Sequence, residues 1–125
     1  EETVNGIKNI KNVGFQKGEV LEKLIREARF SIYPSEWYEN CPFSVMESQM
    51  YGAPVLGANI GGIPELIQVG KTGELFESGN AKDLKQKIEK LWGDKKLCEE
   101  YSKNCKNISF DTIDEYCEKI ITVYQ

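Results

Sequence analysis

The sequence predicts an α/β fold, with a parallel sheet of short strands flanked by helices and followed by a helical C-terminal tail. Short apolar runs alternate with segments whose apolar residues recur at helical spacing. The runs are apolar almost without a break, as expected of strands that are covered on both faces. After residue 80 the chain has helical periodicity alone. Strands that alternate with helices in this way indicate βα units and a parallel sheet.

Four strands are expected, and helices connect them. The strands cover residues 9–15, 29–35, 53–58 and 72–76. The first connecting helix has one apolar face, formed by residues spaced i, i+3, i+4 and i+7: Leu21, Leu24, Ile25 and Ala28. The second helix covers about residues 43–51 and ends before Gly52 and Pro54, a C-cap and a stop signal. The third, within residues 61–67, is short and has Pro64 in its first turn.

The tail is expected to form three amphipathic helices. Their apolar faces are Leu84, Ile88, Leu91 and Trp92, then Leu97, Cys98, Tyr101 and Cys105, and finally Ile113, Tyr116, Cys117, Ile120, Ile121 and Tyr124. Asp111 and Thr112 are candidate N-caps of the last helix. Asp114 and Glu115 follow three residues later, which is the spacing of a capping box.

Length and composition are those of one globular domain. The chain has 125 residues, of which 40% are hydrophobic and 29% are charged. Four strands are few for a parallel sheet of this kind, and the chain opens on a polar stretch. We therefore expect residues 1–125 to be a single, truncated domain of a longer protein.

Composition also excludes several kinds of site. The net charge is −4 without a long basic run, which argues against a duplex nucleic acid as partner. The chain has no histidine, so it holds no Ser–His or Cys–His catalytic pair and no histidine metal site. Its four cysteines form no C-x-x-C pair and it has no D-x-D pair, so we expect no metal and a reducing compartment. No apolar run approaches the roughly 20 residues of a membrane span, and no cleavable signal opens the chain.

The stretch most suited to bind a ligand is the loop over residues 35–43 and the helix that follows it. Ligands of open α/β sheets bind at the carboxyl ends of the strands, where such loops lie. The free amides and dipole of the helix N-terminus attract an anion such as phosphate. Glu39 stands in the loop and Glu47 in the helix, and a carboxylate can accept hydrogen bonds from two vicinal hydroxyls of a sugar.

The two carboxylates also have a simpler interpretation. Ser44 and Glu47 match the capping box, in which serine caps the helix and glutamate reaches back to it. Glu39 by itself is typical of a solvated loop residue. A phosphate at the helix start with a sugar on either side describes a nucleotide-sugar, but residues 35–47 alone leave both interpretations open.

The wider sequence resembles the C-terminal, donor-binding half of GT-B glycosyltransferases, in the large retaining group called family 4. The resemblance rests on "ENCPFSVMESQMYGAPVLGANIGGIPELIQVGKTGELF", in which Glu39 and Glu47 form the pattern E-x7-E. "NVGFQ" before the first helix and "YPS" before the loop are also similar, and the resemblance covers roughly residues 10–124. It implies a Rossmann-like sheet and a hexosyltransferase that takes part in polysaccharide biosynthesis.

The resemblance also implies roles for matched residues. Glu39 would be the catalytic residue at the reacting face of the donor sugar, and Glu47 would bind the ribose. The remaining donor-binding residues would be Cys41, Pro42, Phe43 and Ser44 around the diphosphate, and Phe15 near the base. The substrate would be a UDP- or GDP-sugar, with no cofactor and no metal required. The acceptor would be a glycan or a lipid-linked glycan.

Part of the family pattern lies outside this chain. The family usually carries an Arg and Lys pair upstream of the "NVGF" segment, and an N-terminal half that binds the acceptor. We therefore expect this chain alone to be inactive. The resemblance implies a cytoplasmic location, including the inner face of the membrane, and is compatible with peripheral membrane association of the full-length protein. Two alternatives remain open: a non-catalytic nucleotide-binding or interaction domain, and a sugar-nucleotide 2-epimerase of the same architecture.

Overall fold

The centre of the fold is a three-stranded parallel sheet. The computed structural model of the chain describes residues 6–125. The strands are β1 (Ser31–Tyr33), β2 (Val55–Ala58) and β3 (Gly73–Phe76), in the order β1-β2-β3. Both neighbouring pairs are parallel. The expected parallel α/β sheet is therefore confirmed.

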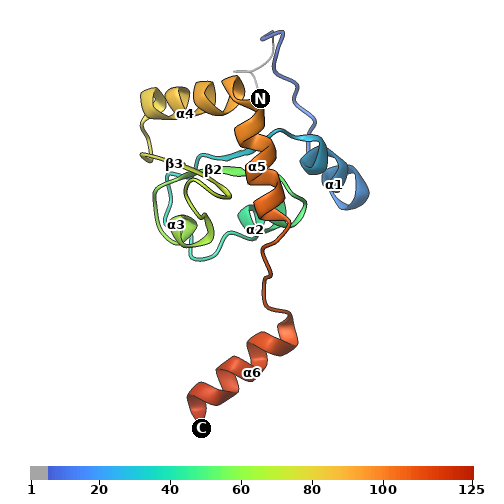
Figure 1. Cartoon of the computed structure of the whole chain (residues 1–125), viewed down its shortest axis with the longest axis vertical. Helices are drawn as coiled ribbons and strands as arrows, with labels where there is room; N and C mark the ends of the chain where they lie inside the picture. The colour runs from blue at the N-terminus through green and yellow to red at the C-terminus, as the bar shows by residue number, and fades with distance from the viewer. Residues whose placement is uncertain (1–5) are drawn as a thin grey trace.

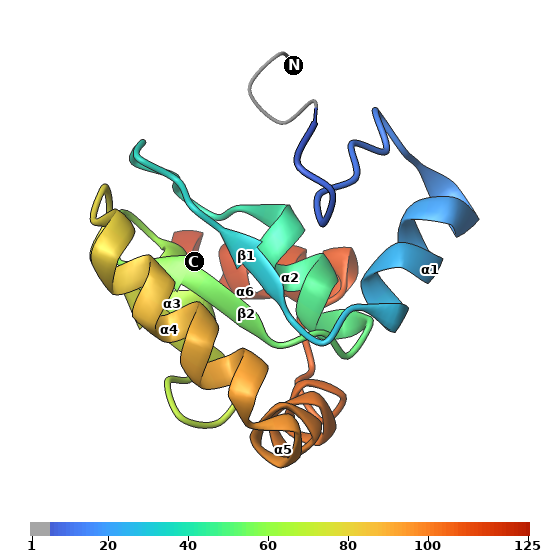
Figure 2. The same ribbon diagram turned by 90° about the horizontal axis from the view of Figure 1, so that it is seen from above.

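Helices cover both faces of this sheet (Figures 1 and 2). On one face lie α2 (Phe43–Met50) and α3 (Ile63–Leu66), and on the other lies α4 (Ala81–Gly93). The next helix, α5 (Lys95–Cys105), packs against α4 and α2. Because helices lie on both sides of β2, all four of its residues are buried, which explains its uninterrupted apolar sequence.

The hydrophobic core lies between β2 and these helices. Leu56, Ile63 and Leu91 are fully buried, and they come from β2, α3 and α4 respectively. Fully burying such a side chain contributes about 1.5–3 kcal/mol to stability. Cys98 and Cys105 of α5 are also buried, as expected for free cysteines that act as small apolar residues.

One buried carboxylate ties β3 to the helices that cover it. Glu74 accepts hydrogen bonds from Lys90 Nζ of α4 and from Tyr101 Oη of α5, each at 2.7 Å. Burial acts to raise the pKa of Glu74, but these two hydrogen bonds and the charges of Lys90 and Lys87 outweigh it and hold the pKa below its ordinary value. Burial and the Glu74 carboxylate raise the pKa of Tyr101.

The strand predicted over residues 9–15 is wrong. These residues form no strand and are exposed. The amide of Gly14 donates to Asn12 Oδ1 at 2.8 Å, and Gly14 has a φ of 64°. This local side-chain turn competes with an extended strand, and none of the three described strands pairs with the segment. The sheet therefore has three strands where four were expected.

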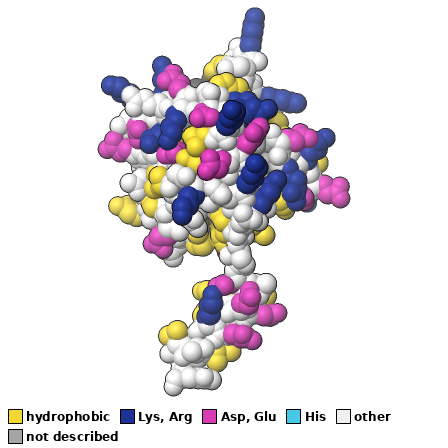
Figure 3. Space-filling model, viewed as in Figure 1, with side chains coloured by type: hydrophobic (Ala, Val, Ile, Leu, Met, Phe, Trp, Pro, Cys, Tyr) yellow, Lys and Arg dark blue, Asp and Glu magenta, His cyan; other side chains and the backbone are white. Residues whose placement is uncertain are grey.

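Two helices lie outside the compact body. Of these, α1 (Gly18–Glu27) lies at its side, with no fully buried residue. The last helix, α6 (Ile113–Tyr124), projects away from it, and every residue of α6 is exposed (Figures 1 and 3). The expected capping box of α6 is confirmed, with Thr112 as the N-cap and Glu115 reaching back. The apolar stripe on α6, which includes Cys117, is exposed, although Ile113 and Tyr116 in its first turns line a cavity shared with α2.

Candidate functional site

Three loops meet at the carboxyl edge of the sheet. They follow β1, β2 and β3 and cover residues 34–42, 59–62 and 77–80. Ser78 Oγ of the third loop donates to the Ser35 carbonyl of the first at 2.9 Å. The Gly62 amide of the second loop donates to the Glu39 carbonyl of the first at 2.7 Å. The loop that carries Glu39 is thus held from both sides.

Two glycines allow this close contact between loops. A Cβ atom at Gly61 would lie 2.5 Å from the Glu39 carbonyl oxygen, and one at Gly62 would lie 1.9 Å from the Asn40 carbonyl oxygen. Both contacts are with backbone, so no side-chain movement relieves them. Glycine is therefore required at both positions so that the two loops can pack, and this packing fixes the Glu39 loop. The sequence predicted only a glycine loop here, without this role.

The N-terminus of α2 begins at the edge of this site without a side-chain cap. Pro42 is the N-cap residue, with φ −70° and ψ 107°, and no side chain accepts a hydrogen bond from the first turn. The Val45 amide donates to the Pro42 carbonyl at 3.0 Å. The predicted capping box of Ser44 and Glu47 is wrong, because the helix starts at Phe43 and Ser44 already has a helical position.

Loss of the capping role leaves the Glu47 carboxylate free. Glu47 is half-buried, and within residues 6–125 its carboxylate forms neither a hydrogen bond nor an ion pair. Glu39 is also half-buried, and only its backbone is engaged by the neighbouring loop. Glu39 thus stands four residues before α2 and Glu47 is the fifth residue of α2, a helix whose first-turn amides are not occupied by side chains. That arrangement suits an anion with hydroxyl-bearing groups on both sides.

The other predicted donor-binding residues divide into two groups. Cys41, Phe43 and Ser44 are exposed beside the start of α2, and Pro42 is buried beneath them. Phe43, with Cys41, also lines a cavity of about 500 Å³ that reaches the first turn of α6. Phe15 stands apart, because it is 90% exposed in the segment before α1 and does not belong to the core cluster. Its proximity to a nucleobase stays a prediction.

The charged residues between positions 30 and 70, a range that includes two of the three loops, are all of one sign. Residues 30–70 contain four glutamates and no lysine or arginine. The positive potential that these residues offer to a phosphate comes from backbone amides and the α2 dipole alone. The Glu39 loop also carries the aromatic residues Trp37 and Tyr38, which are 80% and 88% exposed.

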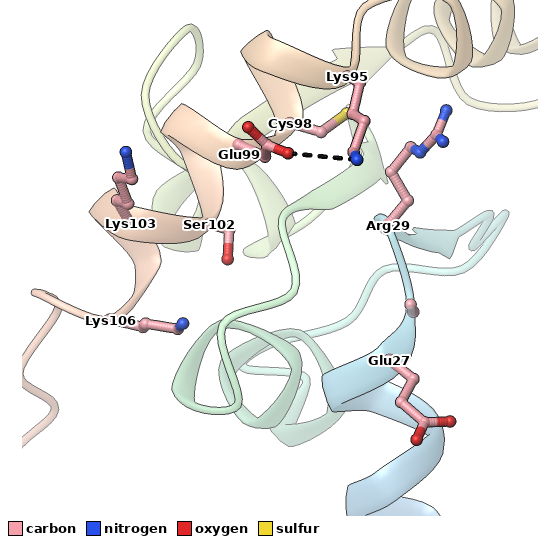
Figure 4. A pocket seen from close by; sticks show the side chains of 9 residues that line it. Glu27, Arg29, Lys95, Cys98, Glu99, Ser102, Lys103 and Lys106 are labelled. Atoms are coloured by element: carbon pink, nitrogen blue, oxygen red, sulfur yellow. Dashed lines mark ion pairs between the residues drawn. The ribbon is translucent and has the colours of Figure 1, made fainter.

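A polar cavity of about 430 Å³ lies away from this edge (Figure 4). Arg29, just before β1, and several α5 side chains line it. Several of its charges already have partners: Lys95 pairs with Glu99 at 3.6 Å, and Arg29 donates to the Trp92 carbonyl at 2.7 Å. The Lys106 side chain lies over Gly52, at the C-terminus of α2, where a cation is favourable. These residues therefore serve the helix ends, and the carboxyl edge remains the candidate site.

Residues 6–125 contain neither a cluster of metal-binding side chains nor a helix that could cross a membrane. No group of three or more metal-binding side chains is present among these residues. None of the helices in this part of the chain is both long and apolar enough to span a bilayer.

Comparison with known proteins identifies the family. The family model described as "Glycosyl transferases group 1" matches residues 2–108. The chain is 35% identical over 89 residues to sulfoquinovosyl transferase SQD2 of Arabidopsis thaliana, covering 69% of this chain and 17% of that protein. It is 28% identical to an uncharacterised 41.2 kDa protein in the cps region of Klebsiella pneumoniae, covering 88% of this chain and 32% of that protein. The chain thus spans at most a third of these relatives.

Solved structures agree on the fold. Anabaena HepE in complex with UDP and glucose superimposes with a TM-score of 0.81 at 24% identity, covering 95% of this chain and 33% of that one. Sucrose-phosphate synthase from Thermosynechococcus elongatus gives a TM-score of 0.78 at 22% identity, covering 90% of this chain and 28% of that one. The uncapped helix that follows the Glu39 loop and carries Glu47 therefore lies in a Rossmann-like domain of the GT-B type. With the family model covering most of its length, this chain belongs to the group 1 glycosyl transferases.

Proposed function

We propose that residues 1–125 form the nucleotide-sugar-binding domain of a retaining glycosyltransferase of family 4. In this proposal the full-length enzyme transfers a hexose from a UDP- or GDP-sugar to a glycan or lipid-linked acceptor. The observation that carries the proposal is the uncapped N-terminus of α2, with Glu39 in the locked loop before it and Glu47 within the helix. The complexes of related structures with UDP support a nucleotide donor.

Each part of the site has a chemical task in this proposal. The amides at the start of α2, around Cys41 to Ser44, hydrogen-bond the diphosphate and stabilise its growing negative charge as it leaves. Glu47 accepts hydrogen bonds from the ribose hydroxyls, and Glu39 contacts the donor sugar at the reacting face. The locked loop keeps Glu39 in place before the donor arrives, which lowers the cost of binding.

The proposal requires groups beyond residues 6–125. Residues 30–70 have no cation to neutralise a diphosphate, so the expected Arg and Lys pair would come from an upstream segment. A missing N-terminal domain would bind the acceptor and close the cleft, and the apolar stripe of α6 suits packing against it. We accordingly propose that this chain alone is inactive, uses no cofactor or metal, and acts in the cytoplasm or at the inner face of the membrane.

Nucleotide titration tests the donor site directly. UDP and GDP are titrated into the 125-residue chain by calorimetry, with Glu47→Ala as the test variant. Glu65→Ala is the matched control, because Glu65 is an exposed glutamate on α3. One of the two nucleotides should bind, and Glu47→Ala should weaken it about tenfold or more, while Glu65→Ala leaves affinity unchanged. Equal affinity of wild type and Glu47→Ala would refute the ribose role.

A second assay tests inactivity of the chain alone. UDP- and GDP-hexoses are incubated with the purified chain, and released nucleotide diphosphate is measured. We expect no release above the rate in buffer. Clear turnover by this chain would contradict the need for the upstream basic pair and the N-terminal domain.

A further inference from the structure

The loop after β3, residues 77–80, is a turn fixed to the N-terminus of α4. The Glu77 amide donates to Asp83 Oδ2 at 2.7 Å, and the Asn80 amide donates to the Glu77 carbonyl at 3.0 Å. Asn80 Oδ1 accepts from two backbone amides in the first turn of α4, as the N-cap of that helix. Gly79 has a φ of 76°, which glycine adopts without strain. The position of this turn is therefore set by α4.

Ser78 connects this turn to the Glu39 loop. Its hydroxyl donates to the Ser35 carbonyl at 2.9 Å, and both residues are half-buried. Among the residues that the structure describes, Ser78 is the only side chain outside residues 34–42 that donates a hydrogen bond to this loop. Ser35 Oγ in turn accepts from the Trp37 amide at 3.2 Å and donates to the Trp37 carbonyl at 3.1 Å. The contact with Ser78 therefore extends along the first half of the loop.

The direction of the Glu39 carboxylate depends on how this loop is held. Within residues 6–125 the carboxylate forms neither a hydrogen bond nor an ion pair, so only the backbone orients it. That backbone is held by another loop at two points, the Ser35 carbonyl and the Glu39 carbonyl, the second of which accepts from the Gly62 amide. Without the Ser78 hydroxyl, the loop is left to pivot about the Gly62 contact alone.

The nucleotide side of the proposed site is held independently of Ser78. The first-turn amides of α2 and the Glu47 side chain belong to a helix that packs against β2, α3 and α5. None of these contacts passes through the turn over residues 77–80. The two halves of the donor site are thus anchored separately, and a change at Ser78 acts on the sugar half.

We propose that Ser78 is a positioning residue for the donor sugar, which sets the direction of the Glu39 carboxylate through the Ser35 carbonyl. The inference rests on the proposed function, because it takes Glu39 as the residue that contacts the sugar. A hydrogen bond weakens steeply as its angle departs from the optimum, so a carboxylate binds sugar hydroxyls well only when its position is fixed. Fixing it in advance also lowers the entropic cost of binding. Ser78 therefore governs the affinity that the sugar adds to the nucleotide.

Calorimetry on the 125-residue chain tests this role. UDP, GDP, UDP-glucose, UDP-galactose, UDP-N-acetylglucosamine and GDP-mannose are titrated, and the tightest nucleotide-sugar is compared with its own nucleotide. The measured quantity is the ratio of the two Kd values. Ser78→Ala should raise the Kd of the nucleotide-sugar about fivefold and leave that of the nucleotide unchanged, because one hydrogen bond to the loop is lost. Ser78→Thr keeps the hydroxyl and should restore the wild-type ratio. A purely structural role would weaken both ligands by the same factor, and an unchanged ratio would overturn the proposal.

Hydrogen exchange in the free chain tests the same contact without a ligand. Ser78→Ala should speed exchange of the backbone amides in residues 35–39 several-fold and leave those of α2 unchanged. Ser102→Ala is the matched control, because Ser102 is also half-buried and its hydroxyl forms no hydrogen bond within residues 6–125. That variant should keep the wild-type ratio and the wild-type exchange of the loop.

The outcomes separate this inference from the proposed function. If the nucleotide binds normally but Ser78→Ala changes neither the ratio nor the exchange of the loop, the positioning role is overturned and the donor site stands. If the wild-type chain binds no nucleotide and no nucleotide-sugar, the proposed function fails, and the role of Ser78 fails with it.

Discussion

Replacing Gly62 with alanine should both destabilise the domain and displace Glu39. The new Cβ would lie 1.9 Å from the Asn40 carbonyl oxygen and 2.9 Å from its carbonyl carbon. The two loops must separate by about 1 Å to restore an ordinary contact, because both groups are backbone. Overpacking of this kind costs about 1–3 kcal/mol. The separation also weakens the 2.7 Å hydrogen bond from Gly62 to Glu39, which contributes about 1 kcal/mol.

The expected total is about 2–4 kcal/mol, a large part of the roughly 5–15 kcal/mol that stabilises a domain. Thermal unfolding followed by circular dichroism should show a melting temperature lower by roughly 8–16 °C, at about 4 °C per kcal/mol. The matched control is Gly93→Ala at the end of α4, where a Cβ meets nothing within 4 Å. That variant should melt at or slightly above the wild-type temperature. Equal melting of Gly62→Ala and Gly93→Ala would refute the packing of the two loops.

Three further predictions concern single side chains. Glu47→Ala should change stability by less than about 0.5 kcal/mol in urea unfolding, because Glu47 does not cap α2; a loss of 1 kcal/mol or more would restore the capping role. Tyr101→Phe should cost about 1.5–3 kcal/mol at neutral pH, because it removes a hydrogen bond to the buried Glu74 carboxylate. The pKa of Glu74 is lowered in the folded state, so the stability that its carboxylate contributes is lost as pH falls through that pKa. The difference in unfolding free energy between wild type and Tyr101→Phe should therefore shrink in acid. A constant difference from neutral pH to acid would contradict this. Thr112→Ala should reduce helicity by circular dichroism without lowering the melting temperature, since every residue of α6 is exposed; a lower melting temperature would show that α6 stabilises the rest of the domain.

The start of α2 shows where sequence reasoning reached its limit. The order Ser44 to Glu47 satisfies the capping-box pattern, and Pro42 is equally suited to the first helical turn. Both patterns are local, and they differ by only two residues in where the helix begins. The structure begins the helix at Phe43, so Ser44 cannot cap and Glu47 is left free. Helix boundaries are determined by the loop that precedes them as well as by the helix residues.

The strand prediction for residues 9–15 was wrong for a related reason. Its apolar residues Ile10, Val13 and Phe15 suit a strand, but a strand is stable only when it pairs. In the described chain β1 and β3 pair only with β2, and a turn at Asn12 occupies the segment instead. The same limit applies to α6, whose apolar stripe was correctly predicted although its packing partner was not readable from the pattern.

The sequence by itself determined the alternation of strands and helices, the burial of β2 and the identity of Glu39 and Glu47 as candidate ligand residues. These features follow from periodicity and residue type, which are local properties of the chain. Only the tertiary structure decided that the Gly61–Gly62 loop locks the loop of Glu39, and that Glu47 caps nothing. It also decided that Trp37 and Tyr38 remain exposed beside Glu39. The first of these facts depends on a contact between loops that are far apart in the chain, and the other two depend on where a loop ends and which side chains it leaves outside the core; local periodicity carries no information about either.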